Sequence, residues 1–311
     1  MIYRVGEQQY RLVDGWAKWP EKPKTVVICG LAVDSQNRVH VLIRGKYPIT
    51  VFDKDGNYLY SWGEGLLKEA HGIYIDKDDC IYCTDEGTHT VSKFSPEGNL
   101  LQVLGNKNQP ADTGYKGQLG VIDRVGPPFN RPTDIAIDLS GDIYVSDGYG
   151  NARIHKFAPD GTLILSWGDA GDAPGQFRLP HSVLVDKHDR VWVTDRENNR
   201  VQIFDTQGNY LDQWTDLDHP TDISIDDQGN VFVSELGRRV SIFDMDGKIL
   251  SRWSGSEENN EDTLYISPHT ISVDLKGDIY VGEVAAAYFA FHKIAGVDRK
   301  AKAIQKFVRI T

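Results

Sequence analysis

Apolar and polar residues alternate in short runs along the whole chain, and these runs recur in a fixed order. IAID at residues 135–138 and IYVSD at residues 143–147 are examples. A period of two predicts β-strands that bury one face. The run that forms the first strand of each copy ends in an aspartate. A tight turn and then a second strand follow this aspartate. Six aspartates mark the copies: Asp34, Asp76, Asp138, Asp186, Asp226 and Asp274.

The second half of each copy is as regular as the first. ITVFDKDGNYLYSWG at residues 49–63 predicts a hairpin with an Asp-Gly turn, and the other copies resemble it. The marker aspartates are 42, 62, 48, 40 and 48 residues apart. Six units of four strands at this period are typical of a six-bladed β-propeller. The sequence therefore predicts an all-β fold in a single domain that covers residues 1–311.

The last unit indicates how the ring of blades closes. AIQKFVRI at residues 303–310 supplies a third strand, and no fourth strand follows it in the sequence. QYRLVDGW at residues 9–16 resembles the fourth strand GNYLYSWG of the first unit. We therefore expect the strand Tyr10–Trp16 to pair with the strand Ile304–Ile310 and to complete the last blade. Closure would hide sheet edges that otherwise invite aggregation.

Composition narrows the choice of partners. The net charge of −11 disfavours nucleic acid, because an acidic protein repels phosphates. The apolar runs fall short of the roughly 20 residues of a membrane helix, and the N-terminus lacks a signal-peptide pattern, so we expect no membrane partner.

The chain contains three cysteines, and this odd, low count predicts a reducing compartment, the cytoplasm. Cys80 and Cys83 lie three apart in a predicted strand and should face opposite ways, which disfavours a shared metal or a disulfide between them.

Histidine recurs at one position of the repeat. The residue five before each marker aspartate begins the strand that should line the central channel, and histidine occupies this position in every second blade. Three imidazoles on alternate blades would converge on the axis and leave a fourth ligand position open, which is the pattern of catalytic zinc. The sequence predicts a bound Zn²⁺ or a similar divalent ion. The six residues are Cys29, His71, Thr133, His181, Thr221 and His269.

Charged residues should crowd the same mouth of the channel, where each second strand ends. Arg44, Glu86 and Arg196 lie ten residues after their marker aspartates, and Tyr149 follows the matching Gly148. Two guanidinium groups near a metal predict a small carboxylate- or carbonyl-bearing substrate. The residue just before this position, at the end of the second strand, is acidic in five of the six copies. We expect these carboxylates to hold the turns in place. They belong to Asp85, Asp147, Asp195, Glu235 and Glu283.

The segment Phe129–Trp214 resembles the propeller of peptidyl-α-hydroxyglycine α-amidating lyase, a family of NHL-repeat propellers. RPTDIAID, IYVSDGYGNARI, GQFRLPHSVLVD and VTDRENNRVQIF carry the resemblance. It implies cleavage of a carbinolamide, N–CH(OH)–COO⁻, into an amide and glyoxylate. It also implies roles for residues that match the family. The implied zinc ligands are His71, His181 and His269, the implied general base is Tyr149, and the implied substrate arginines are Arg44 and Arg196.

The chain departs from the family at several positions. Gly150 stands where the family has a residue that takes part in a disulfide, and Ser267 stands where the family has a methionine. Thr270 stands where the family has an aspartate that helps to hold a structural calcium, which puts Ca²⁺ in doubt. Carbonyls near Leu31 and Ile73 would be the candidate calcium ligands. An altered pocket implies an altered small substrate, and its candidate contacts are Glu86, Ser267, Cys29, Thr133 and Thr221.

Other functions remain open at this stage. A metal-dependent hydrolase of an amide, ester or lactone could use the same three histidines. A non-catalytic NHL propeller that binds a partner has no need of histidine in alternate blades. A calcium-dependent lactonase-type propeller would need acidic and Asn ligands on the axis.

The longest insertion, Asn106–Pro128, should cross the mouth of the channel that holds the histidines and act as a lid.

Overall fold

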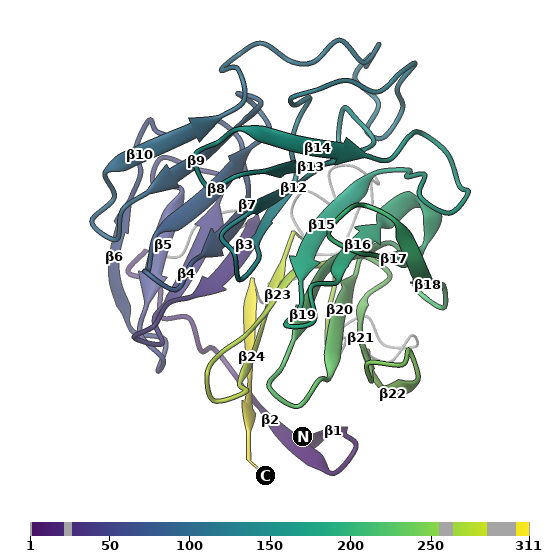
Figure 1. Ribbon diagram of the computed structural model, residues 1–311. Coiled ribbons are helices and arrows are strands. Elements are labelled where there is room, and N and C mark those ends of the chain that lie inside the picture. Colours follow the sequence, from purple (N-terminus) through teal and green to yellow (C-terminus); the bar gives the residue numbers. More distant parts are fainter. Residues whose placement is uncertain (1, 22–26, 255–263, 285–302, 311) are drawn as a thin grey trace, which may run out of the picture. The chain divides into compact units, whose positions relative to one another are not determined.

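The computed structural model describes residues 2–21, 27–254, 264–284 and 303–310. The chain is all-β and has the six blades of a six-bladed β-propeller, as the sequence predicts (Figure 1). The one helix among the described residues is a short 3₁₀ turn, η1, Arg196–Asn198. The chain divides into two compact units, residues 63–221 and residues 1–62 with 222–311. The expectation of a single domain over residues 1–311 stays a prediction.

The unit of residues 63–221 contains three sheets of four strands in chain order. In each sheet every strand pairs antiparallel with its neighbour in sequence. The strands are β7 Ala70–Ile75, β8 Ile81–Asp85, β9 Thr90–Phe94, β10 Leu100–Leu104, β11 Asp134–Ile137, β12 Ile143–Asp147, β13 Arg153–Phe157, β14 Leu163–Trp167, β15 Pro180–Val185, β16 Val191–Asp195, β17 Arg200–Phe204 and β18 Tyr210–Trp214.

The other unit contains two four-stranded sheets and one five-stranded sheet, apart from the first two residues of β19. The five-stranded sheet has the order β1-β2-β25-β24-β23. The strands are β1 Ile2–Val5, β2 Gln8–Val13, β3 Ile28–Val33, β4 Val39–Ile43, β5 Ile49–Phe52, β6 Tyr58–Trp62, β19 Pro220–Ile225, β20 Val231–Glu235, β21 Arg239–Phe243, β22 Ile249–Ser254, β23 Pro268–Val273, β24 Ile279–Glu283 and β25 Ile304–Arg309.

The marker aspartates build the turns between first and second strands. Asp138 shows the geometry: its Oδ1 accepts the backbone N–H groups of Ser140 at 2.9 Å and Asp142 at 3.0 Å. Gly141 takes a φ of +92°, which glycine adopts without strain. The repeat is therefore fixed by turn chemistry as well as by the apolar period.

The N-terminal strand completes the last blade, as predicted. β2 pairs antiparallel with β25, with Leu12 opposite Phe307. Tyr10 is fully buried, and its ring centroid lies 5.4 Å from that of Trp253. The strand begins two residues earlier and ends three residues earlier than the predicted Tyr10–Trp16. β1 adds a fifth strand at the edge, which the sequence did not indicate.

Large apolar side chains hold adjacent sheets together within each unit. In the unit of residues 63–221, Trp167 and Phe177 pack against Phe204, with ring centroids 5.9 and 5.7 Å away. These rings come from successive blades, so the core lies between the sheets. Among the described residues, no helix is long and apolar enough to span a membrane.

Candidate functional site

Two of the predicted metal ligands, His71 on β7 and His181 on β15, are buried and held in the same way. Nδ1 of His71 lies 2.7 Å from the carbonyl oxygen of Thr133, and Nδ1 of His181 lies 2.8 Å from that of Thr221. A carbonyl oxygen only accepts, so Nδ1 carries the proton and Nε2 keeps its lone pair. Both Nε2 atoms are therefore prepared to bind a metal ion.

An irregularity in strand register places these histidines. The pairing of β7 with β8 shifts between Ala70 and Ile73, and the pairing of β15 with β16 shifts between Pro180 and Ser182. Such bulges change the direction of a side chain. In each case a threonine hydroxyl on the second strand accepts a hydrogen bond from a backbone N–H next to the shift. Thr84 accepts from Gly72 at 2.6 Å, and Thr194 accepts from Ser182 at 2.8 Å.

Tyr149 lies between the two imidazoles. Its hydroxyl oxygen is 2.8 Å from Nε2 of His71 and 3.3 Å from Nε2 of His181. Its ring centroid is 4.8 Å from that of His71 and 5.6 Å from that of His181. The phenol is only 6% exposed. The structure thus brings together the predicted base and two of the predicted ligands.

Two guanidinium groups lie over the Tyr149 ring. The guanidinium carbon of Arg196, the first residue of η1, is 5.7 Å from the ring centroid, and that of Arg131 is 5.9 Å away. Arg196 was predicted as a substrate contact. Arg131 was not, since it lies in the connection before β11 and outside the repeat positions that were compared.

The acidic residues that end the second strands tie the turns, as expected. Glu235 accepts from the side chains of Arg239 and Ser241, whereas the other four carboxylates accept backbone N–H groups from the segment that leads into the first strand of their own sheet. The connections join Asp85 to Lys68 and Glu69, Asp147 to Asn130, Asp195 to Arg178, and Glu283 to Ile266 and Ser267. Burial raises the pKa of Asp195, and hydrogen bonds to its carboxylate oppose this effect.

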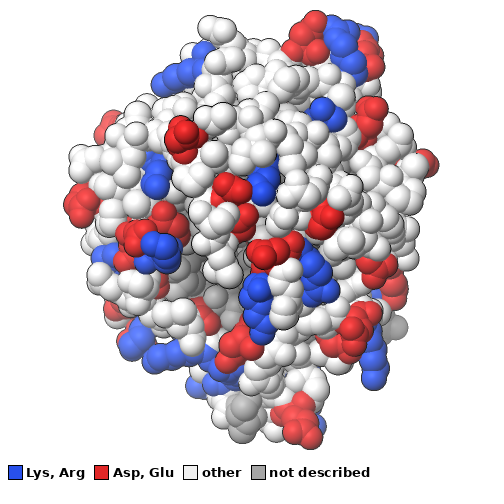
Figure 2. Space-filling model, viewed as in Figure 1, with Lys and Arg blue, Asp and Glu red and all other residues white. Residues whose placement is uncertain are grey.

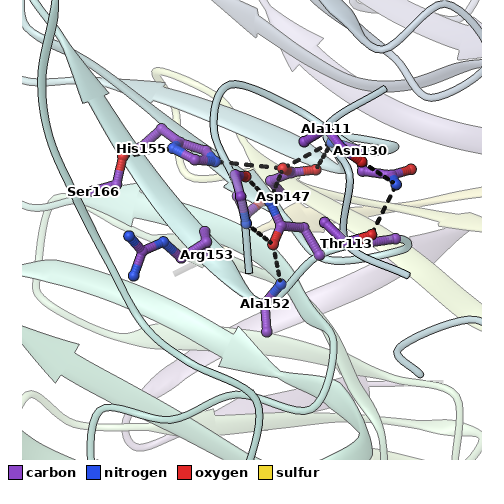
Figure 3. A network of polar contacts seen from close by, with 12 residues as sticks. Ala111, Thr113, Asn130, Asp147, Ala152, Arg153, His155 and Ser166 are labelled. Atoms are coloured by element: carbon purple, nitrogen blue, oxygen red, sulfur yellow. Dashed lines mark hydrogen bonds and ion pairs between the residues drawn. The ribbon is translucent and has the colours of Figure 1, made fainter. Parts of the chain in front are cut away.

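The insertion Asn106–Pro128 is bonded to the turn that carries Tyr149. The amide of Gly120 donates to the carbonyl of Tyr149 at 3.1 Å, and the hydroxyl of Thr113 donates to that of Gly150 at 2.6 Å. Figure 3 shows Thr113 and Asn130 beside Asp147, and the Asn130 side-chain amide donates to Thr113 at 2.9 Å. The insertion therefore lies beside the candidate base. Its action as a lid stays a prediction.

Three other candidate contacts in this unit are occupied by protein groups. The Thr133 hydroxyl lies within 3.1 Å of Ser146 and Pro180, and the carbonyl of Thr221 accepts from His181. Glu86 accepts two hydrogen bonds from Arg131. These contacts hold neighbouring sheets and side chains in place, and contact with a substrate stays a prediction for each of the three.

The remaining candidates belong to the other unit. His269 on β23 is 5% exposed and lies at a register shift between Pro268 and Thr270 like those at the other two histidines. His71, His181 and His269 are thus all buried, and that the three hold one metal ion together stays a prediction. Ser267 and Cys29 are buried, whereas Arg44, just after β4, is exposed.

Acidic and basic side chains are interspersed on the face seen in Figure 2, with no broad area of one sign. The net charge of −11 is therefore not concentrated on this face. No large basic patch, which nucleic-acid binding proteins use to contact phosphates, appears there. The expectation that nucleic acid is not a partner stays a prediction.

Comparison with known proteins finds similarity in sequence and in fold. The NHL repeat family matches residues 129–157 and 177–204. The chain is 32% identical over 306 residues to human NHL repeat-containing protein 3, covering 91% of this chain and 84% of the relative. It is 35% identical over 161 residues to peptidyl-alpha-hydroxyglycine alpha-amidating lyase 1 of Drosophila melanogaster, covering 48% of this chain and 27% of that lyase.

A solved structure extends the similarity of fold to nearly the whole chain. A gluconolactonase from Xanthomonas campestris superposes with a TM-score of 0.61 at 13% sequence identity, covering 99% of this chain and 91% of that one. At this identity the likeness concerns the fold alone.

Proposed function

Because the chain belongs to the family of NHL repeat-containing protein 3 and its propeller is related to the amidating lyases, we propose that it is a metal-dependent lyase. The substrate would be an N-acyl-α-hydroxyglycine or a related small carbinolamide. The observation that carries the proposal is the meeting of two fixed imidazole Nε2 atoms at the hydroxyl of Tyr149.

The donor set fits a divalent ion that prefers imidazole, and zinc is our choice. His71, His181 and His269 would hold it, with Thr133 and Thr221 fixing the first two rings through their carbonyls. A bound zinc would supply a Lewis acid that polarises the substrate oxygens. The doubt about a structural calcium carries over from the sequence, since Thr270 offers a hydroxyl in place of a carboxylate.

The protein side chains divide the remaining work. Tyr149 accepts the proton of the substrate hydroxyl, and the electron pair left on that oxygen forms the aldehyde C=O as the C–N bond breaks. The departing amide nitrogen takes that proton back from Tyr149, so the products are a primary amide and glyoxylate and Tyr149 is regenerated. Arg196 and Arg44 bind the substrate carboxylate through charge-assisted hydrogen bonds.

The test is turnover of N-acetyl-α-hydroxyglycine by the metal-loaded protein, with glyoxylate as the measured product. A lyase forms acetamide and glyoxylate without consuming water. Hydrolysis of a test ester or lactone, with no glyoxylate from the carbinolamide, would favour the metal-dependent hydrolase. A protein that turns over neither and still binds a macromolecule would favour a non-catalytic propeller and contradict the proposal.

We also propose that the protein works in the cytoplasm. The low, odd number of cysteines suits a reducing compartment, and Cys80 and Cys83 form no disulfide. Detection of the protein in the cytoplasmic fraction of its source cells would support this location, and recovery only from an oxidising compartment would contradict it.

A further inference from the structure

Arg131 has an unusual backbone conformation beside the candidate site. Its φ is +64°, in the left-handed region that residues other than glycine rarely adopt. Its backbone N–H donates to Nδ1 of His89 at 3.0 Å. Burial lowers the pKa of His89, which favours the neutral ring and keeps that nitrogen an acceptor. Strain of this kind is kept where the surroundings require one orientation of a side chain.

The guanidinium of Arg131 is held at three of its five N–H donors. Nε and Nη2 donate to one carboxylate oxygen of Glu86 at 3.1 and 2.5 Å, and Nη1 donates to the hydroxyl of Tyr115 at 3.3 Å. Tyr115 comes from the insertion, so that segment helps to fix the arginine. A guanidinium fixed in this way loses little side-chain freedom when it binds a ligand.

The exposure of the two side chains decides whether Glu86 or Arg131 can contact a substrate. The Glu86 side chain is 1% exposed and the Arg131 side chain is 27% exposed. A second carboxylate, Glu69, lies 3.7 Å from Nη2 and is 45% exposed. An exposed contact at that distance contributes little and is easily displaced. Arg131 therefore offers its free donors to solvent, with Glu69 as the competing anion.

The position of Arg131 ties it to the reaction we propose. Its guanidinium lies over the Tyr149 ring, as does that of Arg196. In that reaction Arg196, together with Arg44, binds the carboxylate next to the reacting carbon. Arg131 is left for another part of the same substrate.

We propose that Arg131 is a specificity-determining residue that binds a carboxylate on the acyl part of the substrate. The preferred substrates would then be N-acyl-α-hydroxyglycines whose acyl group itself carries a carboxylate, such as a dicarboxylic acyl group. This inference rests on the proposed function for the identity of the reacting half of the substrate. The recognition of the acyl carboxylate rests on Arg131, Glu86 and Tyr115.

Binding of two unreactive analogues tests this directly. N-succinylglycine and N-acetylglycine lack the hydroxyl and differ in the acyl carboxylate, and their affinities are measured by calorimetry on the full-length metal-loaded protein. We expect the wild type to bind N-succinylglycine at least about tenfold more tightly, the gain of a charge-assisted pair. Arg131→Gln should abolish this preference, so that the two analogues bind with similar affinity.

Three further variants separate recognition from structure. Arg131→Lys keeps the charge and should retain part of the preference. Glu69→Gln removes the competing anion and should increase the preference. Arg124→Gln changes an exposed arginine of the insertion that pairs with Asp112, and it should behave as the wild type.

Equal affinity of the wild type for the two analogues, or an unchanged preference in Arg131→Gln, would overturn the inference. Turnover separates it from the proposed function. Glyoxylate release from N-acetyl-α-hydroxyglycine without a preference in binding would leave the lyase and remove the role of Arg131. A preference in binding with no turnover of N-acetyl-α-hydroxyglycine or N-succinyl-α-hydroxyglycine would keep that role and remove the lyase.

Discussion

At the scale of single residues, a backbone carbonyl decides which imidazole nitrogen is available. Thr133 and Thr221 accept from Nδ1 of the histidine in the preceding sheet, and this directs Nε2 towards Tyr149. A threonine at the repeat position thus orients a neighbouring histidine through its main chain.

Tyr149→Phe tests the candidate base. The substitution keeps the ring that packs on His71 and removes the oxygen that lies between the two imidazoles. We expect kcat to fall by roughly 10²–10⁴, the usual contribution of a general base, with metal content and melting temperature unchanged. Wild-type kcat in this variant would reject the role and favour another proton acceptor.

Asp34 should make the fold sensitive to acid. Burial acts to raise its pKa, but hydrogen bonds from His40 and Arg38 outweigh burial and lower the pKa to about 2. A carboxylate whose pKa is lower in the folded state stabilises the fold above its unfolded pKa. That stability, about 2 kcal/mol, is lost as the pH falls from about 4 to 2.

The check is the free energy of unfolding at pH 7 and at pH 3, measured with urea. Asp34→Asn should reduce the difference between the two pH values. Asp55→Asn, at a largely exposed carboxylate, serves as the matched control and should keep it. An unchanged pH dependence in Asp34→Asn would contradict this assignment.

The sequence predicted the histidines and Tyr149 as site residues because they share a phase of the repeat or match a motif. It missed Arg131, whose importance depends on a left-handed backbone and on partners 16 and 45 residues away. It predicted Glu86 as a candidate substrate contact. The structure shows that carboxylate buried against Arg131, a pairing that no period in the sequence expresses.

At the scale of elements, alternation and turn chemistry predicted the blades, since each strand buries one face and ends in an Asp or Gly turn. β1 was not predicted, because a strand at a sheet edge has little burial to impose a pattern, and Ile2 is 46% exposed. The sequence also did not predict the register shifts at the histidines. They depend on which backbone groups pair across two strands.

Deleting residues 1–18 tests the completion of the last blade. The deletion removes β2, exposes the edge of β25, and removes the buried ring of Tyr10. We expect aggregation or a fall of at least about 10 °C in the melting temperature. Deleting residues 1–6 removes only the edge strand β1 and should cost less. An unchanged melting temperature in the longer truncation would refute the role of β2.

Thr113→Val tests whether the insertion supports the turn that carries Tyr149. The variant removes the hydroxyl that donates to Gly150 and accepts from Asn130, and it keeps the shape of the side chain. The loss of these two buried hydrogen bonds should lower kcat by about 3- to 10-fold without changing metal content. Lys116→Ala, at an exposed lysine of the same segment, is the control. Equal kcat values in wild type and Thr113→Val would show that the turn does not depend on this bond.

At the scale of the whole molecule, the proposed ligands come from both compact units of the chain. His71 and His181 belong to residues 63–221, and His269 belongs to the other unit. If the three bind one ion, metal removal should lower the melting temperature, because a ligand that binds only the folded chain stabilises it.

Elemental analysis of the purified protein tests the central claim most directly. The account predicts about one zinc or similar divalent ion per chain in the wild type. In the variant with His71→Ala, His181→Ala and His269→Ala together, metal content should fall to near zero and glyoxylate release should be lost. Full metal content in that triple variant would contradict the account.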